Sequence, residues 1–490
     1  MYVSILVSFN PSSRTMRSKL QKFTDFAGTL FPQETAYLLS VQQFEDAAKL
    51  GILRRMHHNS RHRRRFIPYD TSLDKRKYSN LKQWVQERLQ AADVDAHFDW
   101  LSAMERQLNR DVISPEEERQ LMRAIREFRA PGFYFTKFFE LARTYRHYLL
   151  IRMRYRHHAQ VEAFLQQWQP AHDRSAATNE RLHQATLDIV RQYSQGQTQS
   201  MQWEDWLTDV FYDEQMDGLN RYMALVRLIF ICFNYRKFEK LRDKFDYIDG
   251  LFTSGKYYSR RLLVNYYGNR LLLHTKFREY DKAEYYGYLS IRDRNSDYIM
   301  YVNNLGAVLL RQKKYEEALA LMRAAYPEMK ATANMHNRIG FVAFYLKCLN
   351  ANGQYDQAER YAETFLRAYK EEVFAYRWHI FFSAFLEALL KLKKYGKLIG
   401  QVRKHSLLQR EKAYRSNANY LPTIPWYDAI AKYKEGELDP EHLYHLMSNS
   451  IDHLQDGLDG KRHQLEDLMQ EMQPFVPGIL NRIREDLPFR

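Results

Sequence analysis

Apolar and polar positions between residues 235 and 398 follow a pattern that recurs along the chain. Five times an aromatic residue follows a short polar turn and is followed three positions later by Ala or Leu. The five pairs are Phe238/Leu241, Tyr280/Ala283, Tyr315/Ala318, Tyr355/Ala358 and Tyr395/Leu398, with aromatics 42, 35, 40 and 40 residues apart. Self-similarity at this period is typical of stacked helix pairs that bury their apolar faces only against neighbouring pairs. The pattern therefore predicts an α-solenoid of antiparallel helix pairs.

Helical patterns also dominate the sequence before these repeats. Residues 16–50 have helical periodicity with one break near Pro32, and a new apolar stripe begins at Ser79. The motif that starts at Ser114, Ser-Pro-Glu-Glu, is a capping box, and its helix is expected to stop at Pro131-Gly132. Gly (18) and Pro (13) are scarce, which favours long helices over tight turns and strands. The predicted fold class is all-α.

Three regions are predicted from changes in this patterning. The polar stretch 194–200 separates an N-terminal helical region, residues 1–198, from the repeats, residues 199–450. Residues 451–490 are expected to form a C-terminal helical cap or tail. A sixth helix pair is possible, with Trp426–Tyr433 as its first helix and Pro440–Met447 as its second.

The repeat at residues 301–326 resembles the tetratricopeptide repeat. Leu305-Gly306 matches the family's Leu-Gly pair on the first helix, and Ala318 and Ala325 match small positions on the second. Tyr315 stands at the turn position. The resemblance covers about residues 220–400, and its other units match less well. In two of them, Leu271 and Leu346 stand where the family prefers a small residue. Three of the four spacings also exceed the family's repeat length, so the resemblance implies an irregular TPR-like solenoid.

The resemblance further implies that first-helix residues line a concave groove. When the units are aligned at their turn aromatics, the first helix of each of four units places one Lys or Arg on this face. Two Asn residues fall on the same face. These residues are Asn269, Lys276, Asn303, Arg311, Lys347 and Lys391. The expected groove is mildly basic and suits an acidic or extended peptide, although the same residues also fit an ordinary solvated helix surface. Clamping of a C-terminal carboxylate is disfavoured, because Asn303 and Ala307 stand where that mode needs Lys and Asn.

The formal charge of +15 is concentrated in three clusters. Residues 51–80 carry a net +7, residues 141–160 carry +5 and residues 391–415 carry +8. The first cluster has no helical period and predicts a loop or connector. The second lies in a stretch expected to be one continuous helix, roughly residues 134–168, in which Arg alternates with Tyr. Localised positive charge attracts polyanions.

Each basic cluster has two interpretations. Arg and aromatic side chains on one face bind phosphates and stack on bases, but Tyr and Leu also pack inward while Arg stems lie along the surface. The first cluster is likewise either a polyanion contact or a solvated connector. The candidate polyanion-binding residues are Arg61, Arg63, Arg64, Arg65, Arg146, Arg152, Arg154 and Arg156.

Candidate catalytic and metal-binding residues are few. The sequence contains no Gly-rich phosphate loop, no zinc-protease motif and no nucleophile elbow. Cys232 and Cys348 are far apart in apolar stretches, and His442 and His445 lack a third ligand at a motif spacing. No cofactor is expected. An active site assembled from distant residues of the N-terminal region stays a minor alternative to a non-enzymatic role.

No apolar run approaches the roughly 20 residues needed to cross a bilayer. The first nine residues make a poor signal peptide, so a cytoplasmic location is predicted. Met16 begins a more ordinary opening, which raises the hypothesis that residues 1–15 are an upstream extension.

The predicted function is a non-enzymatic scaffold or adaptor whose groove binds a protein or peptide. The alternative is a nucleic-acid-associated protein that uses the three basic clusters. A third hypothesis is a regulator whose repeats clamp an enzyme encoded nearby. Partner identity and oligomeric state do not follow from the sequence.

Overall fold

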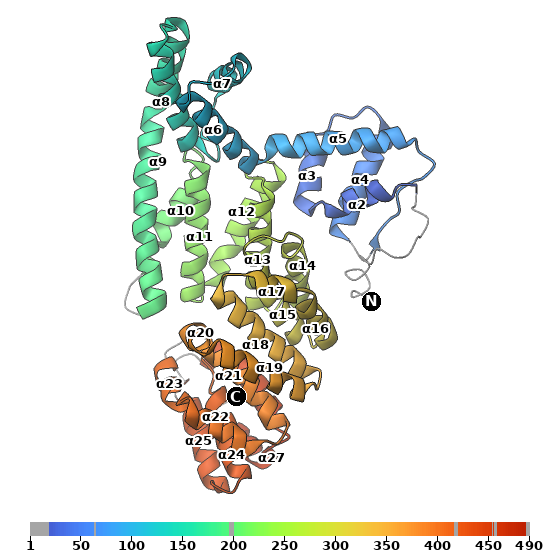
Figure 1. Cartoon of the computed structure of the whole chain (residues 1–490), viewed down its shortest axis with the longest axis vertical. Helices are drawn as coiled ribbons and strands as arrows, with labels where there is room; N and C mark the ends of the chain where they lie inside the picture. The colour runs from blue at the N-terminus through green and yellow to red at the C-terminus, as the bar shows by residue number, and fades with distance from the viewer. Residues whose placement is uncertain are drawn as a thin grey trace. The chain divides into compact units, whose positions relative to one another are not determined.

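The chain folds into α-helices joined by short turns. The computed structural model describes residues 19–62, 65–195, 200–415, 420–452, 454 and 458–486, and in these ranges it contains no β-strand. The described chain divides into two compact units, one of residues 19–277 and one of residues 278–486 (Figure 1). The predicted all-α class is confirmed. The predicted region boundaries at residues 198 and 450 stay predictions, and residues 1–15 lie outside the described ranges.

The helices of the first unit, residues 19–277, are α2 (Gln21–Thr29), α3 (Pro32–Val41), α4 (Ala47–Arg61), α5 (Lys75–Ala92), α6 (Val94–Asn109), α7 (Pro115–Glu127), α8 (Phe135–Ile151), α9 (Tyr155–Gln195), η2 (Ser200–Trp203), α10 (Glu204–Tyr212), α11 (Gly218–Asn234), η3 (Phe238–Leu241), α12 (Arg242–Thr253) and α13 (Arg260–Lys276). Those of the second unit, residues 278–486, are α14 (Tyr280–Ser290), α15 (Tyr298–Arg311), α16 (Tyr315–Ala324), α17 (Tyr326–Ala331), α18 (Met335–Ala351), α19 (Tyr355–Ala368), α20 (Lys370–Tyr376), α21 (Trp378–Lys391), α22 (Tyr395–Lys404), α23 (Leu407–Tyr414), α24 (Thr423–Lys434), α25 (Pro440–Asp452), α26 (Leu458–Met472) and α27 (Pro477–Asp486).

A turn with one backbone geometry precedes each of the five aromatic residues of the sequence pattern. The residue two positions before the aromatic has a φ between 57° and 71°. These five residues are Arg236, Arg278, Lys313, Gly353 and Lys393. In the turn before Tyr315, the Lys313 N–H donates to the Leu310 carbonyl at 3.0 Å and the Lys314 N–H donates to the Leu309 carbonyl at 2.9 Å. This is the Schellman arrangement, which satisfies carbonyls left unpaired at a helix C-terminus.

Each of the five aromatics is the first residue of the helical element after its turn. Tyr280, Tyr315, Tyr355 and Tyr395 begin α14, α16, α19 and α22, and Phe238 begins η3. The Ala or Leu three positions later is fully buried in all five cases. On the partner helix of Tyr315, a Cβ added to Gly306 would lie 3.5 Å from Met322 Sδ, so α15 and α16 pack closely at this point.

Lysines beside these turns form ion pairs with glutamates of an earlier helix. Lys314 pairs with the buried carboxylate of Glu284, and Lys394 lies 2.5 Å from that of Glu359. Both glutamates stand four residues after their aromatic. In α16, Leu319 stands four residues after the aromatic Tyr315, where Glu284 and Glu359 stand in their helices. The residue directly before the next aromatic, Tyr355, is Gln354 rather than Lys. The charged pair is thus replaced as a whole by an apolar residue and an amide.

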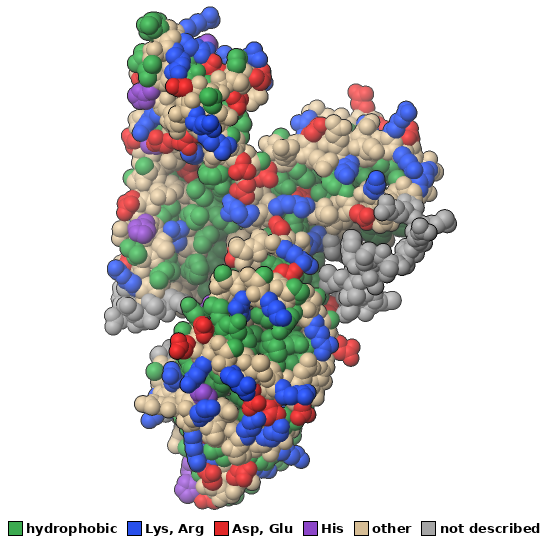
Figure 2. All heavy atoms as spheres, in the orientation of Figure 1, with side chains coloured by type: hydrophobic (Ala, Val, Ile, Leu, Met, Phe, Trp, Pro, Cys, Tyr) green, Lys and Arg blue, Asp and Glu red, His purple; other side chains and the backbone are tan. Residues whose placement is uncertain are grey.

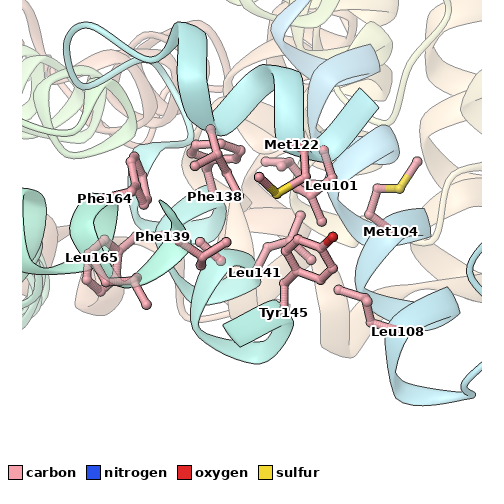
Figure 3. Packing of buried hydrophobic residues seen from close by; sticks show 14 of the residues in the cluster. Leu101, Met104, Leu108, Met122, Phe138, Phe139, Leu141, Tyr145, Phe164 and Leu165 are labelled. Atoms are coloured by element: carbon pink, nitrogen blue, oxygen red, sulfur yellow. The ribbon is translucent and has the colours of Figure 1, made fainter. Parts of the chain in front are cut away.

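The first unit has a dense hydrophobic core among α6, α7, α8 and α9 (Figure 3). It is built from Leu101, Met104, Leu108, Leu121, Met122, Ile125, Phe135, Phe138, Phe139, Leu141, Ala142, Tyr145, Leu149, Val161, Phe164 and Leu165. One buried carboxylate also joins two helix starts. Asp217 accepts the Leu219 N–H at 2.9 Å, which caps α11, and the Thr136 N–H of α8 at 2.8 Å.

The first basic cluster begins in α4 and ends in α5, so the predicted loop or connector was wrong for those parts, whereas the described residues 66–74 between them form no helix. α4 continues to Arg61, because Ile52, Leu53 and Met56 supply a buried apolar stripe between the basic residues. The Asn59 side chain then bonds both backbone groups of Ile67, donating at 2.9 Å and accepting at 2.8 Å. These two hydrogen bonds hold the following segment against the helix.

The predicted continuous helix of residues 134–168 is also wrong, because a turn at Arg152–Arg154 separates α8 from α9. Met153 takes a φ of 56° in this turn, and no Gly or Pro marks it in the sequence. The predicted helix start at Ser114 is confirmed, with Ser114 accepting the Glu117 N–H at 3.3 Å. The helix expected to begin at Ser79 begins one turn earlier, at Lys75.

Candidate functional site

Two of the predicted groove residues, Asn269 and Lys276, lie on α13 in the first unit. Asn269 donates to both the carbonyl and the side-chain oxygen of Asn265 at 3.0 Å, and Asn265 accepts from the Tyr222 hydroxyl of α11 at 2.8 Å. A cavity of about 10 Å³ beside them has room for about one water molecule. Asn269 therefore belongs to a polar contact between α11 and α13. Lys276 Nζ lies 5.4 Å from the ring centroid of Phe238, in cation–π range.

The next two groove residues lie on α15 and differ strongly in exposure. Asn303 is buried, and its Nδ2 donates to the Asn337 carbonyl of α18 at 3.1 Å. Asn350 makes the corresponding link from α18, donating to the Ala384 carbonyl of α21 at 2.9 Å. Arg311, in the last turn of α15, is exposed. Of this pair, only Arg311 is presented to solvent.

Lys347 and Lys391 lie near the carboxyl group of Glu387, whose pKa is raised by burial. Burial raises the pKa of Glu387 to about 8, and the charge of Glu471 acts in the same direction. A hydrogen bond from Asn350 Nδ2 at 3.0 Å and the two lysine charges oppose this shift. Burial therefore shifts Glu387 toward its protonated form, and its carboxyl accepts the Asn350 amide N–H within the packed helices.

The C-terminal segment of the chain contacts this same group. Tyr427 of α24 donates a hydrogen bond to the Glu471 carboxylate of α26, and Lys391 Nζ donates to the Glu471 carbonyl at 3.5 Å. Lys391 Nζ also lies 5.2 Å from the ring centroid of Phe475. Part of the face predicted to bind a partner is thus covered by the chain's own residues 471–475.

Most arginines of the second basic cluster are neutralised by ion pairs. The pairs are Arg143 with Glu140 (3.3 Å), Arg146 with Glu162 (3.2 Å), Arg152 with Asp111 (2.8 Å) and Arg154 with Glu118. Tyr145 is fully buried and donates to Glu118 at 2.9 Å. Its ring is therefore unavailable for stacking on a base. Arg156 is exposed and forms no ion pair within the described ranges.

The other two basic clusters are partly neutralised as well. In residues 391–415, Lys394 and Lys397 pair with Glu359, and Arg403 pairs with Glu437 at 3.0 Å. Figure 2 shows Lys and Arg side chains mixed with Asp and Glu over the surface of the second unit. In the first cluster Arg61 and Arg65 are exposed, while Arg63 and Arg64 lie outside the described residues.

A tyrosine-lined cleft in the second unit did not emerge from the sequence. Its open volume is about 380 Å³, and it is lined by Arg323, Tyr326, Tyr345, Gln357 and Tyr361. The ring centroids of Tyr345 and Tyr361 lie 5.4 Å apart, and the Tyr361 hydroxyl donates to that of Tyr326 at 3.2 Å. The three rings come from α17, α18 and α19. The sequence spaces them 19 and 16 residues apart, an arrangement that no local pattern reveals.

No group of three or more His, Cys, Asp or Glu side chains within the described ranges is placed to hold a metal ion. Among the described helices none is by itself long and apolar enough to cross a bilayer. Only α20 and α21 taken together would be, and they are bent by 116°. Comparison with known protein families, curated proteins and solved structures found no match.

Proposed function

We propose that this protein is a non-enzymatic scaffold, built on an irregular TPR-like solenoid, that binds a protein or peptide partner. The observation that carries the proposal is the recurrence of one corner geometry at the five repeated aromatics. Each corner combines a left-handed residue, an aromatic at the first helical position and a fully buried Ala or Leu three residues later. Stacked helix pairs of this kind present extended surfaces that typically bind other chains.

The tyrosine cleft is the surface of the second unit whose composition best fits a partner contact. Tyr and Arg are enriched where protein interfaces gain most of their binding energy. Tyr326 and Tyr361 are partly exposed, and Arg323 and Gln357 are exposed at the rim. The predicted groove is the competing surface, and Arg311 is its exposed cation. On α18, Tyr345 and Lys347 differ by two residues, or about 200° around the helix, so the two surfaces lie on opposite sides of this helix.

Three matched charge reversals separate these surfaces. Arg323→Glu changes the cleft, Arg311→Glu changes the predicted groove, and Arg367→Glu is the control. All three arginines are exposed and lie in the last turn of a helix, so each reversal costs the same interaction with the helix dipole, about 0.3–1 kcal/mol.

The test is quantitative mass spectrometry of proteins that co-purify with each variant from the native cell. We expect a partner that Arg367→Glu retains and that Arg323→Glu loses by about tenfold or more. Loss with Arg311→Glu instead would assign binding to the predicted groove. The proposal would be contradicted if all variants co-purified the same set of proteins, or if the unmodified protein co-purified none.

The nucleic-acid alternative has less support, because intramolecular carboxylates already neutralise most cations of the second cluster. A protein that neutralises several phosphates loses affinity steeply with added salt. Titration of labelled RNA and DNA across a salt series therefore tests this alternative directly. Tight binding with a steep salt dependence would favour it over the scaffold.

A further inference from the structure

The turn between α8 and α9 exposes a cluster of apolar side chains, here called the α8–α9 tip. It consists of Leu150, Ile151, Met153 and Tyr155, whose exposed fractions are 49%, 75%, 72% and 64%. Four large apolar side chains within six residues are unusual on a protein surface, where such residues are normally scattered singly. Figure 1 shows this turn at the free end of the α8–α9 hairpin, at the top of the view. The tip is therefore convex and open to a partner.

The tip has a defined backbone rather than a loose loop. The Met153 N–H donates to the Leu150 carbonyl at 3.1 Å, and the Arg154 N–H donates to the Leu149 carbonyl at 3.0 Å. Leu149 itself is fully buried in the hydrophobic core among α6, α7, α8 and α9. The apolar groups are thus held outward by a closed helical turn whose inner side is already packed.

An ion pair at the base of the tip joins it to the turn between α6 and α7. Arg152 lies 2.8 Å from Asp111, in the turn between α6 and α7, and its guanidinium lies 3.8 Å from the Tyr148 ring centroid. This pair places the α6–α7 turn beside the tip. Val112, next to Asp111 in that turn, is 54% exposed.

Two exposed cations border this end. Four of the five arginines of residues 141–160 are paired with carboxylates of neighbouring elements and add no net charge to it. Arg156, next to Tyr155, and Arg110, next to Asp111, are exposed and form no ion pair within the described ranges. An anionic surface would match these two cations without breaking the ion pairs that fix the turn.

We propose that the α8–α9 tip docks onto the surface of a bilayer that carries anionic lipids. A convex apolar end bordered by cations matches the two layers of a membrane interface. Leu, Ile and Met side chains enter the acyl boundary, Tyr suits the headgroup level, and Arg binds lipid phosphate and carboxylate groups. A bilayer accepts such a protruding end without needing a preformed pocket.

The test compares two variants that leave the net charge unchanged. Ile151→Gln combined with Met153→Asn removes the two most exposed apolar groups of the tip. Asn is among the few residues that tolerate the left-handed backbone at position 153, so the fold is retained. The control is Leu446→Gln in α25, where the leucine is 53% exposed. Circular dichroism and thermal melts verify folding of all proteins.

The assay is co-sedimentation with vesicles of phosphatidylcholine, with and without phosphatidylserine. We expect the unmodified protein and Leu446→Gln to bind only the anionic vesicles, and the double variant to lose about tenfold or more in affinity. Equal binding by the double variant would overturn the proposal, because it would assign binding to general positive charge. Absence of binding by the unmodified protein would also overturn it. Loss of a co-purifying protein in the double variant would then assign the tip to a protein partner.

A second measurement reports insertion directly. Ile151→Cys labelled with a polarity-sensitive dye should shift its emission to the blue on anionic vesicles. Cys232 and Cys348 are buried, so the new thiol is labelled selectively. Emission unchanged by vesicles that do bind the protein would also overturn the proposal. This test is independent of the scaffold function, since α8 and α9 lie outside the helices that form the tyrosine cleft.

Discussion

The ion pairs around Glu359 give a prediction whose magnitude follows from burial. The Glu359 side chain is only 5% exposed, whereas those of Lys394 and Lys397 are 41% and 38% exposed. Solvent screens such half-exposed lysines, so each separate ion pair contributes about 1 kcal/mol or less. Removing both lysines by Lys394→Gln and Lys397→Gln leaves a buried carboxylate unpaired. We expect this to lower the free energy of unfolding by about 3 kcal/mol at neutral pH.

The chain itself indicates how this loss can be avoided. The position of Glu359 in α19 is held by Leu319 in α16, and the position of Lys394 is there held by Gln354. The variant Glu359→Leu with Lys394→Gln copies that arrangement. Because it buries no charge, we expect its free energy of unfolding to lie within about 1 kcal/mol of the unmodified protein.

The cost of the double lysine variant also depends on pH. Burial raises the pKa of Glu359, but the hydrogen bonds from Lys394 and Lys397 outweigh this effect and hold it below the ordinary value of 4.5. The stabilisation is therefore present above pH 4.5 and is lost as the pH falls through the lowered pKa. The difference between the variant and the unmodified protein should shrink in the same range, because protonation removes the unpaired charge.

Urea denaturation followed by circular dichroism measures these free energies. Hydrogen exchange of the α19 and α22 amides localises the effect, since a chain with two compact units need not unfold in one step. The reasoning would be refuted if Lys394→Gln with Lys397→Gln cost less than about 0.5 kcal/mol. It would equally fail if the Leu-containing variant were as unstable as the double lysine variant.

Three further predictions concern single residues. Gly353→Ala should cost about 1 kcal/mol of unfolding free energy, because the backbone φ at this position is 71°. Gly400→Ala, inside α22, should be neutral or stabilising, and paired urea titrations compare the two variants. Asp217→Ala removes the cap of α11 and a bond to α8 and should cost about 2–4 kcal/mol, so an unchanged melting temperature would contradict the capping role. Glu387 has a raised pKa of about 8, so stability should fall as pH rises from 4.5 to 8. Glu387→Gln should weaken that fall, which thermal melts at pH 5 and pH 8 detect.

Several features of the fold were predictable because they depend on short stretches of chain. The capping box at Ser114 needs only a hydroxyl and a carboxylate three residues apart, and it forms as expected. The helices of the proposed sixth pair also exist, as α24 and α25. The scarcity of Gly and Pro correctly indicated an all-helical chain.

Other turns were invisible because their residue types do not mark them. Met153 and Lys313 take left-handed conformations that usually select Gly, so the break between α8 and α9 carries no sequence signal. Backbone hydrogen bonds and the packing of the flanking helices stabilise these turns instead. The predicted loop was wrong for residues 54–61 for a related reason, since the charged residues there obscure the few apolar positions that hold α4 in place.

The candidate sites depend on contacts between distant segments. Asn303 lies in α15 and Lys391 ends α21, but only packing decides that Asn303 is buried against α18 and that Lys391 meets residue 471. The tyrosine cleft likewise needs α17, α18 and α19 together. The sequence alone determines those helix starts and apolar faces that carry a cap or a clear periodicity, such as the start at Ser114, because these signals act within a few residues. Which side chains meet, and which stay exposed, is decided by tertiary structure, because burial and ion pairing join residues tens of positions apart.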